Sequence, residues 1–220
     1  TANDRSDPFE PANRRIYGVS NFLDRQLFRP AAMTYRRVLP RPIRSGAHNF
    51  VSNLDEPSIA INDLLQGKLK RAGTSTMRFA TNTTFGVAGL FDVAAKAGLL
   101  KHDNDFGITM GKWRLKSGPY LYIPLAGPSS VRDLTGIGVD FFLDPLGWVS
   151  FRGSDAIFAS ETVVGALDAR VRADRALKDF KAISVDPYAS MRSAYLQSRE
   201  DKVQNGKINI DALPDFPDDT

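Results

Sequence analysis

The sequence of 220 residues contains no cysteine. This absence excludes disulfide bonds, zinc sites built on thiolates and cysteine nucleophiles together. It does not assign the chain to a cellular compartment, because cysteine-free proteins occur in all of them. A chain of this length can bury most of its apolar surface in one large or two small domains. It therefore needs neither a disulfide nor a metal to fold.

Long apolar runs are also missing. A helix that crosses a bilayer needs about 20 consecutive apolar residues, whereas the longest uncharged stretch, residues 117–131, contains two glycines and three prolines. Because these residues break helices, we expect any contact with a membrane to come from amphipathic helices or from an assembly of short ones. No signal peptide is recognisable, as in a mature exported chain or a cytosolic one.

Charges of the two signs nearly balance, with 29 Lys and Arg against 25 Asp and Glu and a formal charge of +4. The last ten residues hold four aspartates and no base, so the rest of the chain carries +8. Such a chain can be attracted to anionic lipid headgroups or nucleic acid, although a solvated surface of mixed charge explains the same numbers. The basic clusters lie beside aromatic and apolar residues, without a nucleic-acid recognition motif. We predict no nucleic-acid partner.

The motifs of common enzymes are absent as well. The sequence has no G-x-S-x-G nucleophile elbow, no P-loop and no dinucleotide fingerprint. Its two histidines, His48 and His102, lack the spaced partners of a metal site, so we assign both a structural or surface role. Asp103 and Asp105 depart from the EF-hand register and fit a capped turn. We predict no enzymatic activity, no cofactor and no metal site.

Helical periodicity is what the sequence does contain. Apolar spacing, caps and prolines predict helices over about 8–28, 29–39, 43–54, 57–66, 68–84, 128–143, 155–183 and 187–206. In this prediction Pro30 and Pro57 each separate two helices, and the acids Asp55 and Glu56 cap a helix start. A short strand near Tyr120 is confined by flanking prolines. We expect residues 1–6 and 207–220 to be tails, the second acidic and disordered.

Residues 85–100 differ from the helices around them. The segment is apolar and small, with glycines at positions 86, 89 and 98. Each glycine costs a helix about 1 kcal/mol relative to alanine and lets the backbone approach another surface closely. We predict a short hairpin of two weak helical pieces. Gly136 and Gly138, inside another predicted helix, are interpreted as small residues that allow close helix packing.

Many short motifs occur in the order typical of one family. They include Asp7-Pro8-Phe9-Glu10, Asn49-Phe50-Val51-Ser52-Asn53-Leu54-Asp55-Glu56-Pro57, Asn82-Thr83-Thr84-Phe85-Gly86, Gly89-Leu90-Phe91-Asp92-Val93-Ala94 and Asp186-Pro187-Tyr188. Over residues 7–206 the chain resembles the MlaA (VacJ) family of outer-membrane lipid-asymmetry lipoproteins. The resemblance implies one all-α domain, in which amphipathic helices form a ring around a channel with minor irregular or β segments.

The resemblance also implies a function. The family removes misplaced phospholipids from the outer leaflet of the outer membrane and passes them to a periplasmic carrier, which maintains lipid asymmetry. Expected partners are phospholipid, the outer membrane on its periplasmic-leaflet side, a trimeric porin and the lipid carrier. A non-transporting module that braces porins is the alternative. Family members normally carry an acylated N-terminal cysteine, so here the anchor was removed or this member lacks it.

Candidate site residues follow from the same resemblance. The glycine-rich segment matches a hairpin loop beside the channel, where flexibility would gate lipid entry; a packed core hairpin is the alternative. The gate candidates are Phe85, Gly86, Val87, Gly89, Leu90, Phe91 and Asp92, of which Asp92 would cap a helix or face the channel. Tyr188, Arg192, Tyr195 and Arg199 recur at helical spacing. They are expected to form a channel wall or contact headgroups, or else a surface stripe.

Overall fold

The computed structural model describes residues 7–144 and 154–204, with the side chains of the second range described from residue 162. The two predicted tails, residues 1–6 and 207–220, lie outside these ranges. The described chain is mostly helical with one two-stranded hairpin, which confirms the predicted helical class. No helix among the described residues is long and apolar enough to cross a membrane.

The elements follow one another in a simple order. They are α1 (Glu10–Leu23), the π-helical η1 (Asp24–Phe28), α2 (Arg29–Val38), α3 (Arg41–Leu65), α4 (Leu69–Phe85), α5 (Val93–Lys96), α6 (Phe106–Lys112), β1 (Tyr120–Ile123), β2 (Gly127–Ser130), α7 (Val131–Leu143), α8 (Ser154–Ile183) and α9 (Pro187–Gln204).

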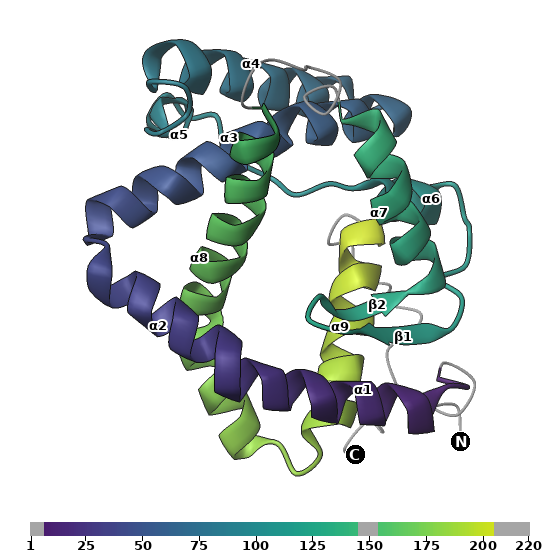
Figure 1. Ribbon diagram of the computed structural model, residues 1–220. Coiled ribbons are helices and arrows are strands. Elements are labelled where there is room, and N and C mark those ends of the chain that lie inside the picture. Colours follow the sequence, from purple (N-terminus) through teal and green to yellow (C-terminus); the bar gives the residue numbers. More distant parts are fainter. Residues whose placement is uncertain (1–6, 145–153, 205–220) are drawn as a thin grey trace, which may run out of the picture.

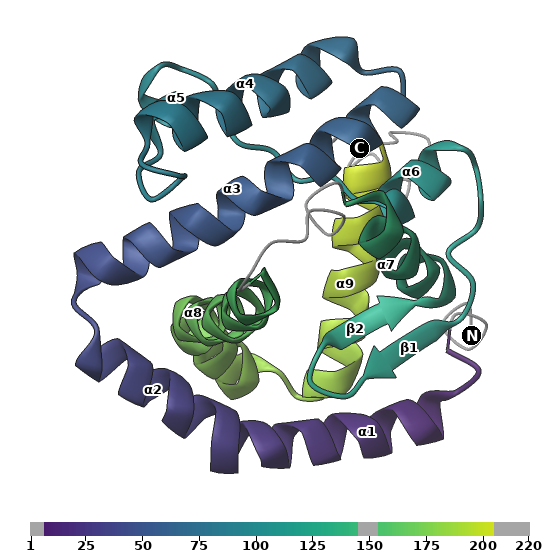
Figure 2. The ribbon, with the colours of Figure 1, turned by 45° about the horizontal axis from the view of Figure 1, so that its top comes forward.

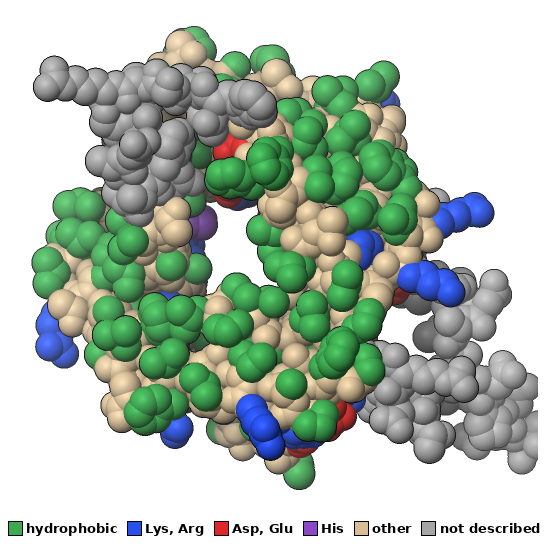
Figure 3. Space-filling view, turned by 45° about the vertical axis from the view of Figure 1, so that its right-hand side comes forward, with side chains coloured by type: hydrophobic (Ala, Val, Ile, Leu, Met, Phe, Trp, Pro, Cys, Tyr) green, Lys and Arg blue, Asp and Glu red, His purple; other side chains and the backbone are tan. Residues whose placement is uncertain are grey.

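In the ribbon view these elements are arranged around a central opening between the backbones (Figure 1). α1 and α2 run along one side, α3 and α4 along the next, and α7, the hairpin and α9 along a third, while α8 passes between α2 and α3 and contacts both. Figure 2 shows α3 and α4 side by side and α8 inside the angle formed by α2 and α3. The space-filling view shows the hollow with apolar side chains gathered around its mouth (Figure 3).

The predicted helix boundary at Pro30 is wrong. The backbone stays helical from Glu10 to Val38, and η1 directly precedes the helix that contains Pro30. Proline cannot donate a backbone hydrogen bond, and its ring crowds the preceding turn. Here the N–H of Arg29 reaches the carbonyl of Asp24, five residues back. This wider π-helical turn accommodates the proline without ending the helix.

The boundary predicted at Pro57 is wrong for a different reason. α3 continues through Pro57, although a proline in a helix interior costs about 3 kcal/mol. Glu56, predicted to be a cap, is fully buried and accepts a hydrogen bond from Arg78 of α4 at 2.6 Å. Packing of α3 along α4 and this ion pair hold the helix together across the proline.

Three shorter elements also differ from the prediction. Gly127–Ser130 is strand β2, antiparallel to β1, so α7 begins only after Ser130, whose Oγ accepts from the Asp133 N–H. The sequence pattern does not predict helix α6. It does place Asp105 in a capped turn, and Asp105 caps the start of α6 by accepting from the Ile108 N–H at 2.8 Å. The predicted hairpin of two weak helical pieces in residues 85–100 has only one helical turn of its own, α5; Phe85 ends α4, and the rest consists of turns and irregular chain.

Candidate functional site

The described residues bury polar side chains and expose apolar ones. Seventeen polar or charged residues are buried against ten hydrophobic ones, four of which are alanines, while 26 large hydrophobic residues are exposed. Monomeric soluble proteins rarely expose contiguous apolar patches larger than a few hundred Å². Water disfavours such a surface by about 25 cal/mol per Å². The parts of the surface where these apolar side chains gather are therefore suited to an apolar environment.

Polar networks hold the inside together. Asn62 of α3 donates to Asp140 of α7 at 2.7 Å, and the Thr109 hydroxyl of α6 donates to Asn62 at 2.8 Å. His102 contacts the buried carboxylate of Asp63, and the ring of the other histidine lies 3.3 Å from an aspartate of α8. Both histidines thus have the structural contacts that we expected. Because these polar groups are paired, they stiffen the frame rather than offer a reactive site.

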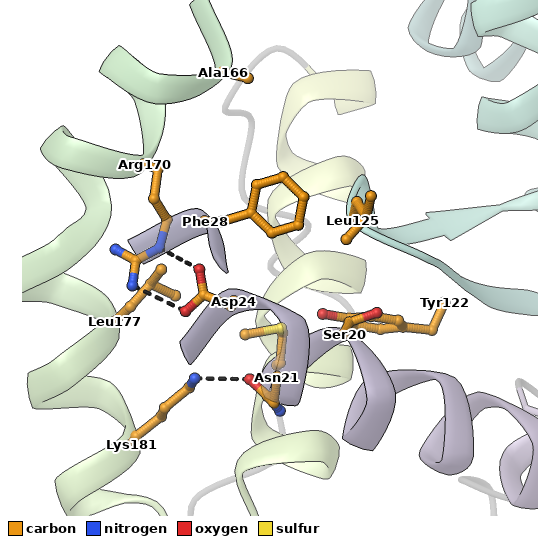
Figure 4. Close-up of a pocket in the computed structure, with 11 residues that line it drawn as sticks. Ser20, Asn21, Asp24, Phe28, Tyr122, Leu125, Ala166, Arg170, Leu177 and Lys181 are labelled. Carbon is orange, nitrogen blue, oxygen red and sulfur yellow. Dashed lines mark hydrogen bonds and ion pairs between the residues drawn. The ribbon is translucent and has the colours of Figure 1, made fainter. Parts of the chain in front are cut away.

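A cleft of about 260 Å³ lies where α1, η1, α8, α9 and the hairpin meet. We call it the inner cleft. Figure 4 shows Phe28 and Leu125 on one side of it, with Asp24 and Arg170 paired opposite and Lys181 beside them. The rest of its lining comes from Ser20, Asn21, Tyr122, Ala166, Leu177 and Met191. The lining is thus mixed: a charged wall of Asp24, Arg170 and Lys181, which also carries Leu177, faces apolar side chains that include Phe28 and Leu125.

The charged wall is tightly organised. Arg170 donates two hydrogen bonds to the carboxylate of Asp24, at 2.6 and 3.0 Å, and a third to Asp174 at 3.0 Å. These bonds raise the pKa of Arg170, so its guanidinium stays charged. Lys181 donates to Asn21 at 2.7 Å, and burial lowers the pKa of its ammonium. The inner cleft can hold a molecule that is charged at one end and apolar at the other.

The predicted gate segment, residues 85–92, does not line the inner cleft. In both ribbon views α3 runs between this segment and the hollow (Figures 1 and 2). Asn49 of α3 donates to the Leu90 carbonyl at 3.1 Å, and a Cβ on Gly89, where φ is +92°, would come within 2.7 Å of Asn53. The segment is thereby held closely against α3, with Gly86 also buried.

The side chains of the gate segment divide into two groups. Phe85, Val87 and Phe91 are exposed. Asp92 instead caps α5 by accepting from the Ala95 N–H, and it also accepts from Arg78 at 3.1 Å. Asp92 is thus engaged with its own helices, and the exposed group is apolar.

The four candidates on α9 all face carboxylates. Tyr188 and Arg192 bond the buried Asp7, the arginine at 2.9 Å. Tyr195 donates to Asp133, and Arg199 contacts that carboxylate at 2.8 Å. Arg199 also donates two bonds to Asp105, at 2.7 and 2.9 Å. The structure therefore brings the four together as a ladder that ties α9 to the N-terminal segment, α6 and α7.

Sequence reasoning missed the charged residues of the inner cleft. Asp24 and Arg170 are 146 positions apart, and Lys181 belongs to the same charged half of α8. The only available signal was the change of α8 from apolar to charged along its length. That change marks an exposed helix face as readily as a site.

Fold and surface together define a class: a helical protein with many exposed apolar side chains, a largely polar interior and an amphipathic cleft. The family model of the MlaA lipoprotein matches residues 5–202. The chain belongs to that family, as its motifs predicted.

Known relatives and a solved structure agree with this assignment. The intermembrane phospholipid transport system lipoprotein MlaA of Escherichia coli K12 is 35% identical over 92% of this chain and 80% of its own. That of Haemophilus influenzae is 34% identical over 98% and 86%, respectively. A chain solved for the structural basis of maintenance of bacterial outer membrane lipid asymmetry has a TM-score of 0.80 at 34% identity, covering 90% of this chain and all of its own. These transport names agree with the prediction that the chain is not an enzyme.

Proposed function

We propose that this chain is an outer-membrane phospholipid-transport lipoprotein that takes misplaced phospholipids from the outer leaflet and passes them to a periplasmic carrier. The observation that carries the proposal is a set of exposed apolar side chains around a hollow whose wall contains an amphipathic cleft. A phospholipid has the same two-part chemistry, with a charged headgroup and apolar chains. The names of the relatives support the same function.

In this proposal the helices form a ring around a lipid channel. Short amphipathic helices that cannot cross a bilayer suit an assembly lying within one leaflet, here the periplasmic one. Lipids would then enter the hollow from the surrounding leaflet or from the outer leaflet, and they would leave on the aqueous side toward the carrier. Exposed apolar side chains on the rim also suit contact with a trimeric porin, the partner that we propose in the membrane.

We keep the gate segment as the proposed gate, although it would act on the channel indirectly, through α3. Its backbone rests on α3 through Gly89 and Leu90, and α3 in turn contacts α8, which lines the inner cleft. Movement of the segment would thus reach the channel through α3. For the α9 ladder, complete pairing with carboxylates favours a wall whose side chains position the helix over direct headgroup contact.

Obstruction of the inner cleft tests the function. Ala166 and Ala169, three residues apart on α8, are both exposed, but only Ala166 lines the inner cleft. The chain and its Ala166→Trp and Ala169→Trp variants would be placed in liposomes, and transfer of labelled phospholipid to the carrier would be timed. We expect Ala166→Trp to slow transfer at least tenfold and Ala169→Trp to leave it unchanged.

Two results would decide against the proposal. One is a wild-type protein that neither binds phospholipid nor passes it to a carrier. The other is an Ala166→Trp variant that folds, binds porin and transfers lipid at the wild-type rate. The second result would favour the porin brace.

A further inference from the structure

A second cleft, of about 230 Å³, adjoins the inner cleft. We call it the basic cleft. The two share Asp24, Arg170, Leu177 and Lys181, so the Arg170–Asp24 ion pair lies on their common boundary. Beyond this boundary the basic cleft is lined by Arg25, Arg29, Asp174 and Lys178. The apolar lining of the inner cleft and the cationic lining of the basic cleft thus meet at the Arg170–Asp24 ion pair.

The basic cleft has an excess of positive charge. Five cations and two carboxylates line it, which leaves a net charge of +3. Arg29 and Arg170 share Asp174, at 2.9 and 3.0 Å. Among the described residues, neither Arg25 nor Lys178 forms an ion pair with a carboxylate. Cations from η1, α2 and α8 converge here although like charges repel, so an anion would relieve the repulsion.

We propose that the two clefts form one site for a phosphate-bearing amphiphile, with the phosphate in the basic cleft and the acyl chains in the inner cleft. The site rests on the proposed transport function and assigns the headgroup position within it. Arginine forks match phosphate oxygens, and lysine supplies point charge. Arg25 and Lys178 would contact the phosphate first.

Asp24 competes with the phosphate in this site. Without a ligand its carboxylate occupies two of the donors of Arg170. A bound phosphate would take over those donors, because it offers more acceptor oxygens and more charge. Asp24 belongs to η1, and π-helical turns inside α-helices occur frequently at functional sites. The ion pair would therefore open when the headgroup arrives and close when it leaves.

The first experiment removes the two cations that lack carboxylate partners. The full chain in detergent would be titrated with dihexanoylphosphatidylglycerol, with dihexanoylglycerol, which lacks phosphate, and with inorganic phosphate. We expect Arg25→Gln/Lys178→Gln to raise the Kd for the phospholipid about tenfold, as two charge contacts are lost, and to leave dihexanoylglycerol unaffected. Arg36→Gln/Arg37→Gln removes the same charge from the exposed face of α2 and should change neither.

The second experiment uses a variant that is expected to strengthen phospholipid binding instead of weakening it. Asp24→Asn raises the net charge of the cleft and frees Arg170, so phospholipid should bind several-fold more tightly. If Asp24 only braced the fold, this variant would melt earlier and bind more weakly. Circular dichroism and a thermal melt of each variant check the fold.

The outcomes separate the site from the function. If inorganic phosphate binds as tightly as the phospholipid, and the double variant weakens both, the phosphate chemistry is supported and its source is free phosphate. Unchanged phospholipid binding in both site variants would overturn the site and leave transport intact. Failure of the wild-type chain to bind any lipid would overturn the transport function itself.

Discussion

Arg78 of α4 and Glu56 of α3 form an ion pair that is almost completely removed from solvent. Their Nε–Oε1 distance is 2.6 Å, and their side chains are 3% and 0% exposed. The same guanidinium donates to Asp92 and to the Leu99 carbonyl. Arg78 of α4 therefore contacts α3 and the chain on both sides of α5.

Loss of one partner of this pair should be costly. Arg78→Ala leaves the Glu56 carboxylate buried without a counter-charge, which costs about 3–5 kcal/mol. Thermal denaturation in detergent should show a large fall in Tm, and Glu56→Gln/Arg78→Met should lose less than the single variant. Arg14→Ala is the control, because Arg14 pairs with Asp186 on the surface, where a pair contributes about 1 kcal/mol or less. Equal losses in the two single variants would contradict the assignment.

Gly136 and Gly138 of α7 should respond oppositely to alanine. A Cβ on Gly136 would lie 2.5 Å from the backbone nitrogen of Gly107 in α6, whereas nothing lies within 4 Å of one on Gly138. Gly136→Ala must push α6 and α7 apart, at about 1–3 kcal/mol. Gly138→Ala gains helix propensity, up to about 1 kcal/mol. Chemical denaturation of the two variants measures both signs.

Asp133 and Asp140 of α7 should give opposite pH dependences of stability. Burial alone would raise the pKa of Asp133, but hydrogen bonds from Arg199 and Tyr195 outweigh it and lower the pKa. Its stabilisation is therefore present above the ordinary carboxyl pKa, about 3.9, and is lost as pH falls through the lower folded value. Burial raises the pKa of Asp140. Its contribution is present below the ordinary value and is lost as pH rises through the folded one.

Asparagine variants measured from pH 3 to pH 7 test these signs. Asp133→Asn should cost about 2 kcal/mol at pH 7 and progressively less toward pH 3. Asp140→Asn should lose most stability relative to wild type at low pH and less as pH rises. Parallel pH profiles for the two variants would show that the carboxylates do not differ in this way.

Gly89 and Gly98 offer a matched test of the gate segment. Both have positive φ, +92° and +84°, so alanine strains the backbone at either position. Only at Gly89 does the new Cβ collide, with Asn53 of α3, while nothing lies within 4 Å at Gly98. We expect Gly89→Ala to lift the segment from α3 and alter phospholipid transfer severalfold, with Gly98→Ala close to wild type. Equal transfer rates would remove the segment from gating.

Phe85 and Phe91 should matter for the membrane rather than for folding. Their side chains are 74% and 61% exposed, and burial of a phenylalanine contributes about 1.5–3 kcal/mol. Phe85→Ser/Phe91→Ser should therefore keep the wild-type melting temperature in detergent and reduce liposome association at least tenfold in a flotation assay. Thr84→Ser, next to Phe85 at the end of α4, is the control. An early melt in the double variant would place both rings in a protein core instead.

Local features of the fold could be predicted because their partners lie a few residues away. Gly67 ends α3 with φ of +73°, and the Lys68 N–H closes the turn on the Asp63 carbonyl. Asp105 caps α6 within three residues. Family motifs added the transport function, which composition and periodicity could not supply. The same local rules misplaced the boundary at Pro57.

The sequence by itself determined most of the helices, some of their caps and the family, since these depend on spacing and on motif order along the chain. Only the tertiary structure decided that Glu56 pairs with Arg78 instead of capping a helix, and that Asp24 of η1 pairs with Arg170 of α8. It likewise placed the gate segment on the side of α3 that faces away from the hollow, and it paired the arginines of α9 with carboxylates. The physical reason is that burial and ion pairing depend on which helices pack together, and that packing joins residues far apart in the chain.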